Sequence, residues 1–284
     1  MYLDPLDLTA DRWLDRILDS IERSKAPKGT TWIVEAPIRT IGGQYFDLTK
    51  GDEDHRETIR RVVDVGKAIG AVAANIHVVA PSHSSDQLTP ASREAALRLA
   101  GQSIRFYIDA CDRSGLIPQI ENIPPVGRMR EAAFVFSPIG AAPADLLALV
   151  DTFPSLRITL DVSHAALYLN WQQIDLTQIE PELRFVACYH RHAESMGNLA
   201  EYVAAVTAEV TTVHVSNASG LLGEGRDYTD GDEDLDNALR GLVGRVPYFV
   251  TETLEPNPDV AVGMRDAQTH LLNLRDAETS RSQT

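Results

Sequence analysis

Six short stretches of the chain have the hydrophobic pattern of strands in a sheet. In each of them, apolar residues either run together or alternate with polar ones, which favours a strand over an amphipathic helix. The stretches are residues 30–37, 73–81, 116–124, 156–163, 210–217 and 247–255.

Helical periodicity fills most of the intervals between these strands. Apolar residues recur at every third or fourth position in residues 10–24, 54–70, 92–115, 142–154 and 235–244. The interval 165–209 is ambiguous, because "LRFVACY" would also fit a strand. We favour a helix there, since residues recur at helical spacing at Ile179, Leu183, Val186 and His190.

Alternation of strands and helices at this spacing predicts βαβ units and therefore a parallel sheet. No linker rich in glycine and serine divides the chain, so we expect one domain over residues 1–275. The last residues, 276–284, are expected to form a disordered tail.

Composition and charge narrow the class of partner. Hydrophobic residues make up 44% of the 284 residues, enough for a sizeable core. The net charge is −15, from 26 basic and 41 acidic residues, which disfavours nucleic acid and favours a small-molecule ligand. Because the chain has no CxxC pair, no signal-peptide pattern and no apolar run near the ~18 residues of a membrane span, we expect a cytoplasmic protein without a membrane partner. Homo-oligomerisation stays open.

Five successive predicted strands carry a residue that can bind a metal at or near the carboxyl end. In a parallel barrel these ends meet at one mouth, where active sites are built. Each residue alone could be an ordinary buried polar group, and Asp161 could simply cap the helix that follows it. Together they favour a common site, formed by His77, Glu121, Asp161, His214 and Glu252.

The motifs around these residues resemble those of a known superfamily, the xylose isomerase-like TIM barrels. The motifs are "IHVVAP", "IENIP", "LDVSHA", "VHVSNASGLLGEG" and "TETLE", and the resemblance covers residues 31–255. This superfamily includes sugar phosphate isomerases and epimerases and the apurinic endonucleases. The resemblance implies an α/β fold of the TIM (β/α)8 type.

The barrel predicted in this way has too few visible strands. Six are clear, and "MYLDP" at the N-terminus could be a seventh. No room is left upstream for the first strand of the family. We therefore expect either a barrel without its first strand or a true start that lies upstream of Met1.

The isomerase and epimerase branch of the family implies specific roles for residues of this chain. By resemblance, one divalent metal is bound by Glu121, Asp161, His214 and Glu252, and Glu121 and Glu252 also act as base and acid. Substrate contacts are expected from His77, Asn122 and His164. An oxygen-rich donor set suits Mn²⁺ or Mg²⁺, with Zn²⁺ or Co²⁺ as alternatives. The expected reaction is isomerisation or epimerisation of a sugar or polyol through loss of a proton next to a carbonyl.

Two other functions stay open at this point. The endonuclease branch needs a further histidine on the strand of "WIVEAP" and an Asp-x-His pair before "GEG". This chain has Glu35 at the first position and Asn217 and Ser219 at the pair, which disfavours DNA repair. The other alternative is a catalytically inactive barrel that binds a metal or sugar.

Two smaller features also give predictions. "GLLGEG", residues 220–225, is expected to form a turn, or else to hold a substrate hydroxyl through its backbone amides. His190 and His192 are expected on a solvated helix face, or else on a lid over the mouth.

Overall fold

The computed structural model describes residues 1–128, 134–193, 195–229, 232–257 and 259–281. Its centre is a parallel six-stranded sheet with the order β1-β2-β3-β6-β7-β10. Each strand lies within a predicted stretch, so all six strand predictions are confirmed. The strands are β1 (Ile33–Glu35), β2 (Ala73–His77), β3 (Ile117–Glu121), β6 (Arg157–Asp161), β7 (Val210–Val215) and β10 (Tyr248–Thr251).

Two antiparallel hairpins follow strands β3 and β7. One pairs β4 (Val126–Arg128) with β5 (Phe134–Phe136), and the other pairs β8 (Asn217–Ser219) with β9 (Gly223–Arg226). The predicted turn at 220–225 is therefore confirmed for its first residues, while its last three belong to β9.

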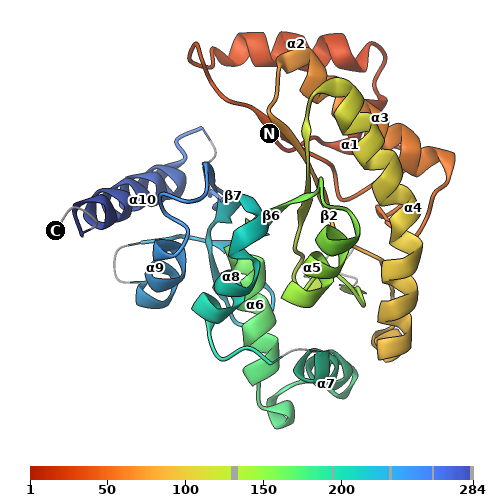
Figure 1. Ribbon diagram of the computed structural model, residues 1–284, viewed down its shortest axis with the longest axis vertical. Coiled ribbons are helices and arrows are strands. Elements are labelled where there is room, and N and C mark those ends of the chain that lie inside the picture. The colour runs from red at the N-terminus through yellow and green to blue at the C-terminus, as the bar shows by residue number, and fades with distance from the viewer. Residues whose placement is uncertain (129–133, 194, 230–231, 258, 282–284) are drawn as a thin grey trace.

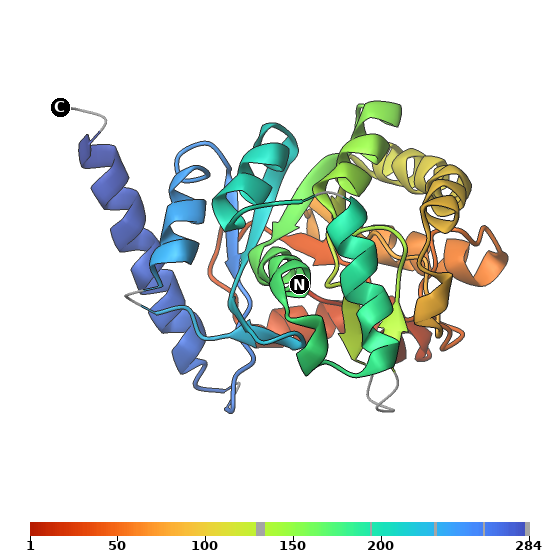
Figure 2. The same ribbon diagram turned by 90° about the horizontal axis from the view of Figure 1, so that it is seen from below.

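The helices follow one another in chain order around the sheet, from α2 at the top of Figure 1 through α4 and α5 to α9 and α10. In both views α10 lies at the outer edge of the molecule, far from α4 (Figures 1 and 2). The helices are α1 (Pro5–Thr9), α2 (Trp13–Ser24), α3 (Glu53–Ile69), α4 (Pro90–Ser114), α5 (Pro143–Thr152), α6 (Val162–Gln173), α7 (Arg184–Ala193), α8 (Leu199–Val206), α9 (Glu233–Arg240) and α10 (Val262–Arg281), with short 3-10 turns η1 (Ser85–Gln87), η2 (Leu176–Gln178), η3 (Pro181–Leu183) and η4 (Thr207–Glu209).

Capping residues explain where the long helices begin and end. Asp52 accepts a hydrogen bond from His55 N at 3.1 Å at the start of α3, and Thr89 forms a capping box ahead of Pro90 at the start of α4. Gly70 and Gly115 end these helices with positive φ angles of 67° and 71°. Helices α6, α7 and α8 confirm the helical interpretation for most of residues 165–209, including Val186 and His190 in α7, but Ile179 lies outside the helices and Leu183 lies in the 3-10 turn η3.

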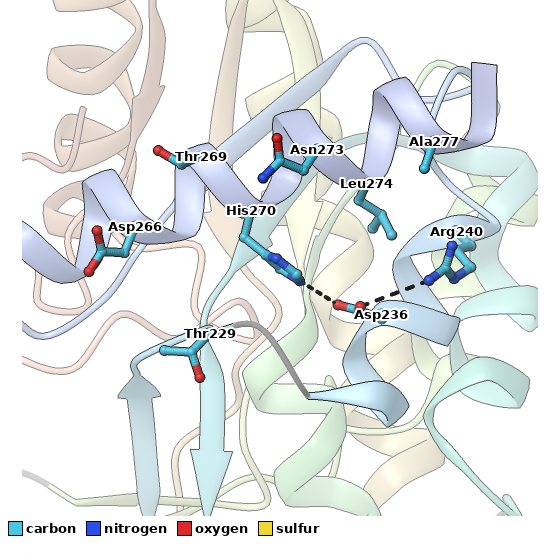
Figure 3. Close-up of a pocket in the computed structure, with 9 residues that line it drawn as sticks. All are labelled: Thr229, Asp236, Arg240, Asp266, Thr269, His270, Asn273, Leu274 and Ala277. Carbon is cyan, nitrogen blue, oxygen red and sulfur yellow. Dashed lines mark hydrogen bonds and ion pairs between the residues drawn. The ribbon is translucent and has the colours of Figure 1, made fainter. Parts of the chain in front are cut away.

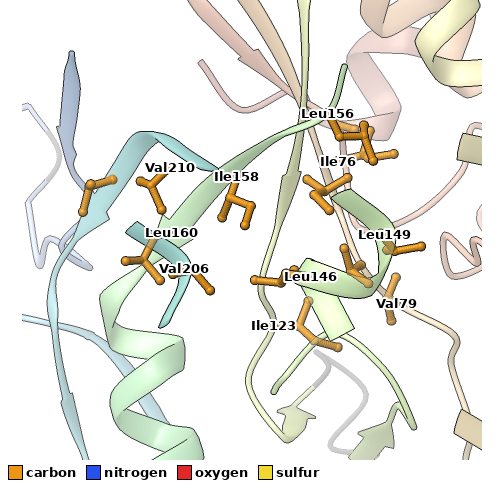
Figure 4. Packing of buried hydrophobic residues seen from close by; sticks show 14 of the residues in the cluster. Ile76, Val79, Ile123, Leu146, Leu149, Leu156, Ile158, Leu160, Val206 and Val210 are labelled. Carbon is orange, nitrogen blue, oxygen red and sulfur yellow. The ribbon is translucent and has the colours of Figure 1, made fainter. Parts of the chain in front are cut away.

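The main core lies between the sheet and its helices. Apolar residues on one face of the strands pack against α5 and α8, as Figure 4 shows. Residues at alternate positions of the same strands face the other way, into the barrel. The packed set in Figure 4 includes Ile76, Ile158, Leu160, Leu146, Leu149 and Val206.

The sheet is curled like part of a TIM barrel, and β1 and β10 form its two edges among the described residues. The predicted strand at "MYLDP" is reduced to one parallel bridge, between Tyr2 and Glu35. It is so short because Pro5 already begins α1. In the part of the chain that the structure covers, no helix is both long and apolar enough to cross a membrane.

The C-terminal prediction needs a correction. Residues 276–281, expected to be disordered, continue helix α10. An ion pair of 2.7 Å between Arg240 of α9 and Glu278 of α10 joins the two helices. Residues 282–284 lie outside the described residues. The prediction of a single domain over residues 1–275 stays a prediction.

Candidate metal and substrate site

A cavity of about 530 Å³ opens at the carboxyl ends of the parallel strands. Its volume falls in the range of pockets that bind small molecules. The sheet contributes polar side chains, the β8–β9 hairpin adds Glu224, and the β4–β5 hairpin and neighbouring loops add an apolar wall. This wall includes Ile38, Tyr45, Phe46, Val79, Ile123, Phe136 and Leu254.

Four residues at the carboxyl ends of the strands are placed so that they could hold one metal ion, and all of them except His214 line the cavity. Each offers a ligand atom, and these atoms all lie within 4.8 Å of one another. They come from β3, β6, β7 and the residue after β10, because neighbouring parallel strands bring their carboxyl ends to the same edge. The group consists of Glu121, Asp161, His214 and Glu252, the same four residues that the sequence predicted.

Glu121 is the most tightly held of these carboxylates. Its side chain is 1% exposed, Oε1 lies 3.1 Å from His214 Nδ1, and Oε2 accepts a hydrogen bond from Asn75 Nδ2. Glu252 also contacts His214 Nδ1, at 2.9 Å, but its side chain is 42% exposed. A substrate in the cavity could therefore reach Glu252 far more easily than Glu121.

Asp161 acts as a helix cap as well as a member of this group. Its Oδ1 accepts a hydrogen bond of 2.9 Å from His164 N at the start of α6. Because a carboxylate has two oxygens with several acceptor positions, the cap leaves capacity for another ligand. The two interpretations of Asp161 in the sequence are therefore compatible.

Asn122 differs from its predicted role as a substrate ligand. It is fully buried, its Nδ2 donates to Asp161 O at 2.9 Å, and its Oδ1 accepts from Asp161 N at 2.8 Å. Its backbone oxygen lies 2.8 Å from His164 Nδ1. Both ends of the amide are thus engaged by backbone, and Asn122 positions Asp161 and His164 from behind the cavity.

A second group of possible ligands adjoins the first. It consists of Glu35, His77 and Glu121, and its ligand atoms also lie within 4.8 Å of one another. His77 Nε2 is 3.6 Å from Glu35 Oε1 and 3.7 Å from Glu121 Oε2. Glu121 belongs to both groups and links them.

Glu224 enters the same cavity from the β8–β9 hairpin. Its Oε2 lies 3.2 Å from His164 Nε2. Since His164 Nδ1 faces the Asn122 carbonyl, the imidazole is held between a carbonyl and a carboxylate. Both its nitrogens therefore face acceptors, which favours the doubly protonated ring.

Burial and mutual charge shift the pKa values in this cavity. Burial raises the pKa of Glu35 well above its usual value, and the Glu121 charge adds to the effect. For Glu121 itself, burial is outweighed by His214 and His77, and its pKa is lowered. Burial alone would lower the pKa of His214, but Glu121 and Glu252 raise it well above the usual value.

Asp161, His164 and Glu224 show the same balance. Burial raises the pKa of Asp161 to about 6 against the opposing charge of His164. Burial would lower the pKa of His164, but Asp161 and Glu224 raise it to about 10. Glu224 has a lowered pKa, because its bond to His164 outweighs the effect of burial. The His164 and His214 imidazoliums supply positive charge that offsets the buried carboxylates around them.

A cavity of similar size, about 540 Å³, lies between α9 and α10 and has different chemistry. Asp236 accepts a hydrogen bond from His270 Nε2 at 2.9 Å and lies 3.9 Å from Arg240 Nη2 (Figure 3). It also accepts one from Tyr228 Oη at 2.6 Å. These polar groups satisfy one another and join the two helices. We therefore interpret them as a structural network.

The structure thus brings the predicted ligands together and adds residues that the sequence analysis did not select. Glu35 ends β1 as the other ligands end their strands, so the same rule would have found it. Asn75 lies two positions before His77 and shares its face of β2. Glu224 gave no such signal, because a hairpin outside the sheet places it. The predicted solvated face holds for His192, but His190 is 2% exposed and packs against Tyr168 and Tyr189.

A parallel curled sheet with an acidic and imidazole-rich cluster at its carboxyl edge places the chain among TIM-barrel-like proteins, and the cluster could hold a metal ion. Residues 33–243 match the family described as xylose isomerase-like TIM barrel, and the chain belongs to this family. Among curated proteins, no sequence matches the chain.

Solved structures with a similar fold include several sugar epimerases. A D-tagatose 3-epimerase-like protein has a TM-score of 0.63 at 16% identity, over 95% of this chain and 86% of its own. A 3-keto-D-glucoside 4-epimerase from E. coli has a TM-score of 0.57 at 14% identity, over 95% and 87%. A Thermus thermophilus protein soaked with ZnCl₂ has a TM-score of 0.61 at 16% identity, over 97% and 87%. At these identities the likeness shows the shared fold.

Proposed function

We propose that the protein is a divalent-metal-dependent isomerase or epimerase that acts on a sugar or polyol. The observation that carries this proposal is the group of Glu121, Asp161, His214 and Glu252, whose ligand atoms lie within 4.8 Å of one another and of which all but His214 line a cavity of about 530 Å³. The epimerases among the solved structures of similar fold support the reaction class.

The residues of this group fit a divalent cation. Three carboxylates and one imidazole lie close together, and a bound cation would offset the repulsion between the carboxylate charges. Oxygen donors in this majority suit Mn²⁺ or Mg²⁺, and the imidazole also allows Zn²⁺ or Co²⁺. A bound ion would polarise a carbonyl oxygen of the substrate and stabilise negative charge that develops there.

The protein residues then supply proton transfer and orientation. Glu252 faces the cavity with a half-exposed carboxylate and is suited to take or return a proton on the carbon next to the carbonyl. Glu121 is the second proton carrier in this proposal, and Asn75 and His214 fix the position of its two oxygens. His77 and His164 are placed to bind substrate hydroxyls, since both line the cavity.

Solvent-deuterium exchange tests this proposal directly. The protein, loaded with Mn²⁺, is incubated in D₂O with a panel of free ketoses, and NMR follows the proton next to the carbonyl. We expect this proton to be lost with at least one ketose. Absence of exchange across the panel, together with incision of an abasic oligonucleotide, would point to a nuclease instead; sugar binding without exchange would indicate a binding protein.

A further inference from the structure

The β8–β9 hairpin is fixed to the rest of the molecule on two sides. Its turn is held by α6, and its second strand by the segment after β10. The bonds run from Asn170 Nδ2 to Gly220 O (2.8 Å), from Trp171 Nε1 to Leu221 O (2.9 Å) and from Leu254 N to Gly225 O (2.8 Å). Glu224 lies between these attachments, so its backbone position at the cavity is fixed by hydrogen bonds on both sides.

Glu224 and His164 form a direct donor–acceptor pair at the cavity, with His164 Nε2 3.2 Å from Glu224 Oε2. The 2.8 Å contact between His164 Nδ1 and Asn122 O requires the ring to donate there, because a carbonyl can only accept. This contact orients the ring so that Nε2 faces Glu224 Oε2 at 3.2 Å. A substrate hydroxyl that displaces this direct contact could donate to the carboxylate and accept from the imidazole, so both groups would keep a hydrogen-bond partner.

A phosphate group would fit this environment poorly. A phosphate ester carries about −1.5 to −2 charge near pH 7 and offers strong acceptor oxygens. The described residues that line the cavity contribute five carboxylates against two histidines, and neither lysine nor arginine. The carboxylates are Glu35, Glu121, Asp161, Glu224 and Glu252.

We propose that Glu224 is a specificity-determining residue, which with His164 binds a free hydroxyl of the substrate and rejects phosphorylated sugars. This inference rests on the proposed function, because it takes the ligand to be a sugar or polyol. It adds that the substrate is an unphosphorylated sugar or polyol.

Binding measurements with a matched pair of sugars test this inference. The affinities of the Mn²⁺-loaded protein for D-fructose and D-fructose 6-phosphate are measured by calorimetry or ligand-detected NMR. We expect the wild type to prefer the free sugar. Glu224→Gln replaces a charged hydrogen-bond acceptor with a neutral one and should weaken D-fructose binding by about tenfold. Glu224→Ala removes the acceptor and should weaken binding by up to about 100-fold. Both should reduce the preference over the phosphate ester.

Controls separate this effect from damage to the fold or metal site. Glu180→Gln removes the same charge at an exposed position where the side chain makes no capping bond, and it should leave both affinities unchanged. Melting temperature and Mn²⁺ affinity should be the same in all three variants. His164→Ala combined with Glu224→Ala should weaken D-fructose binding by less than the product of the single effects, because the two residues share one hydroxyl.

The outcomes distinguish this inference from the proposed function. Equal or tighter binding of the phosphate ester by the wild type overturns the inference, as does wild-type affinity in Glu224→Gln, even when deuterium exchange proceeds. Failure of both sugars to bind also overturns it. If D-fructose binds in a Glu224-dependent way and no ketose exchanges, the inference stands and the isomerase proposal fails.

Discussion

Glu252 and Glu121 contact the same nitrogen of His214 but differ in their surroundings. The Glu252 side chain is 42% exposed, whereas the Glu121 side chain is 1% exposed and bonded through both oxygens. Replacing Glu252 therefore changes the group that a substrate meets and leaves the buried framework intact. This makes it the cleaner of the two positions at which to test proton transfer.

We expect Glu252→Gln to lower turnover by about 10² to 10⁴, the usual contribution of a positioned general acid or base. Metal affinity should weaken only modestly, since glutamine retains an oxygen ligand. Steady-state kinetics at saturating Mn²⁺ would measure the first effect and titration calorimetry the second. Turnover close to that of the wild type would show that Glu252 carries no proton. Glu233→Gln, at an exposed position of α9, serves as the charge control.

The buried His190 should make the free energy of unfolding depend on pH. Neither of its ring nitrogens has a hydrogen-bond partner among the described residues, and burial lowers its pKa to about 3. In the unfolded chain its pKa is about 6.5. Between about pH 6.5 and pH 3, the unfolded state binds a proton on His190 that the folded state does not bind. The free energy of unfolding is therefore unaffected by titration of His190 above about pH 6.5 and falls progressively as the pH is lowered towards 3.

From this residue alone we expect the free energy of unfolding to fall by about 2 kcal/mol between pH 7 and pH 5. His190→Phe keeps a ring against Tyr168 and Tyr189 and should remove this component of the pH dependence. Urea unfolding at the two pH values measures it. The same substitution at exposed His192 is the control, and an unchanged slope in His190→Phe would contradict the assignment.

At the scale of single elements, the β8–β9 hairpin depends on two glycines with left-handed backbone. Gly220 has φ +58° and open space around it, whereas Gly225 has φ +67° and would place a Cβ 2.6 Å from Leu254 Cγ. Substitution by alanine thus adds backbone strain at both positions, but it adds a collision only at Gly225.

Gly220→Ala should cost about 1 kcal/mol in free energy of unfolding, the usual penalty for a left-handed non-glycine residue. Gly225→Ala should cost more and should also weaken sugar binding, because the strand that carries Glu224 must shift. Chemical denaturation and the D-fructose titration described above measure the two effects. Identical behaviour of the two variants would mean that the contact with Leu254 does not fix the hairpin.

For the whole molecule, the net charge of −15 is concentrated in part at one end of the barrel, where five carboxylates line the cavity. A divalent ion bound there would offset this repulsion only in the folded state, in which the strands bring the carboxylates together. Metal binding should therefore raise the stability of the entire fold.

Removing bound metal with a chelator should lower the melting temperature. Adding Mn²⁺ at 100 times its Kd should then raise the free energy of unfolding by about 2.7 kcal/mol. Asp161→Asn keeps an N-cap residue for α6 but removes a charged ligand, so its melting temperature should respond much less to Mn²⁺. Differential scanning calorimetry with Mn²⁺, Mg²⁺, Co²⁺ and Zn²⁺ provides the measurement. A fold indifferent to all four ions would contradict the metal site.

The sequence by itself determined the six strands, most of the helices and the residues at the strand ends. These features follow from local periodicity, capping residues and the rule that parallel strands share one carboxyl edge, so Glu121, Asp161 and His214 could be selected without coordinates. Even the competing interpretation of Asp161 as a cap was present in the local pattern, and one carboxylate satisfies both roles.

Only the tertiary structure decided which side chains meet over long sequence separations. It buried His190, bonded the Asn122 amide to Asp161 and continued α10 through residues expected to be disordered. It also brought Glu224 to His164 through a hairpin that returns to the cavity. Periodicity records which face of an element is apolar, whereas these contacts depend on what packs against that face and on how a loop folds back, which no local pattern contains.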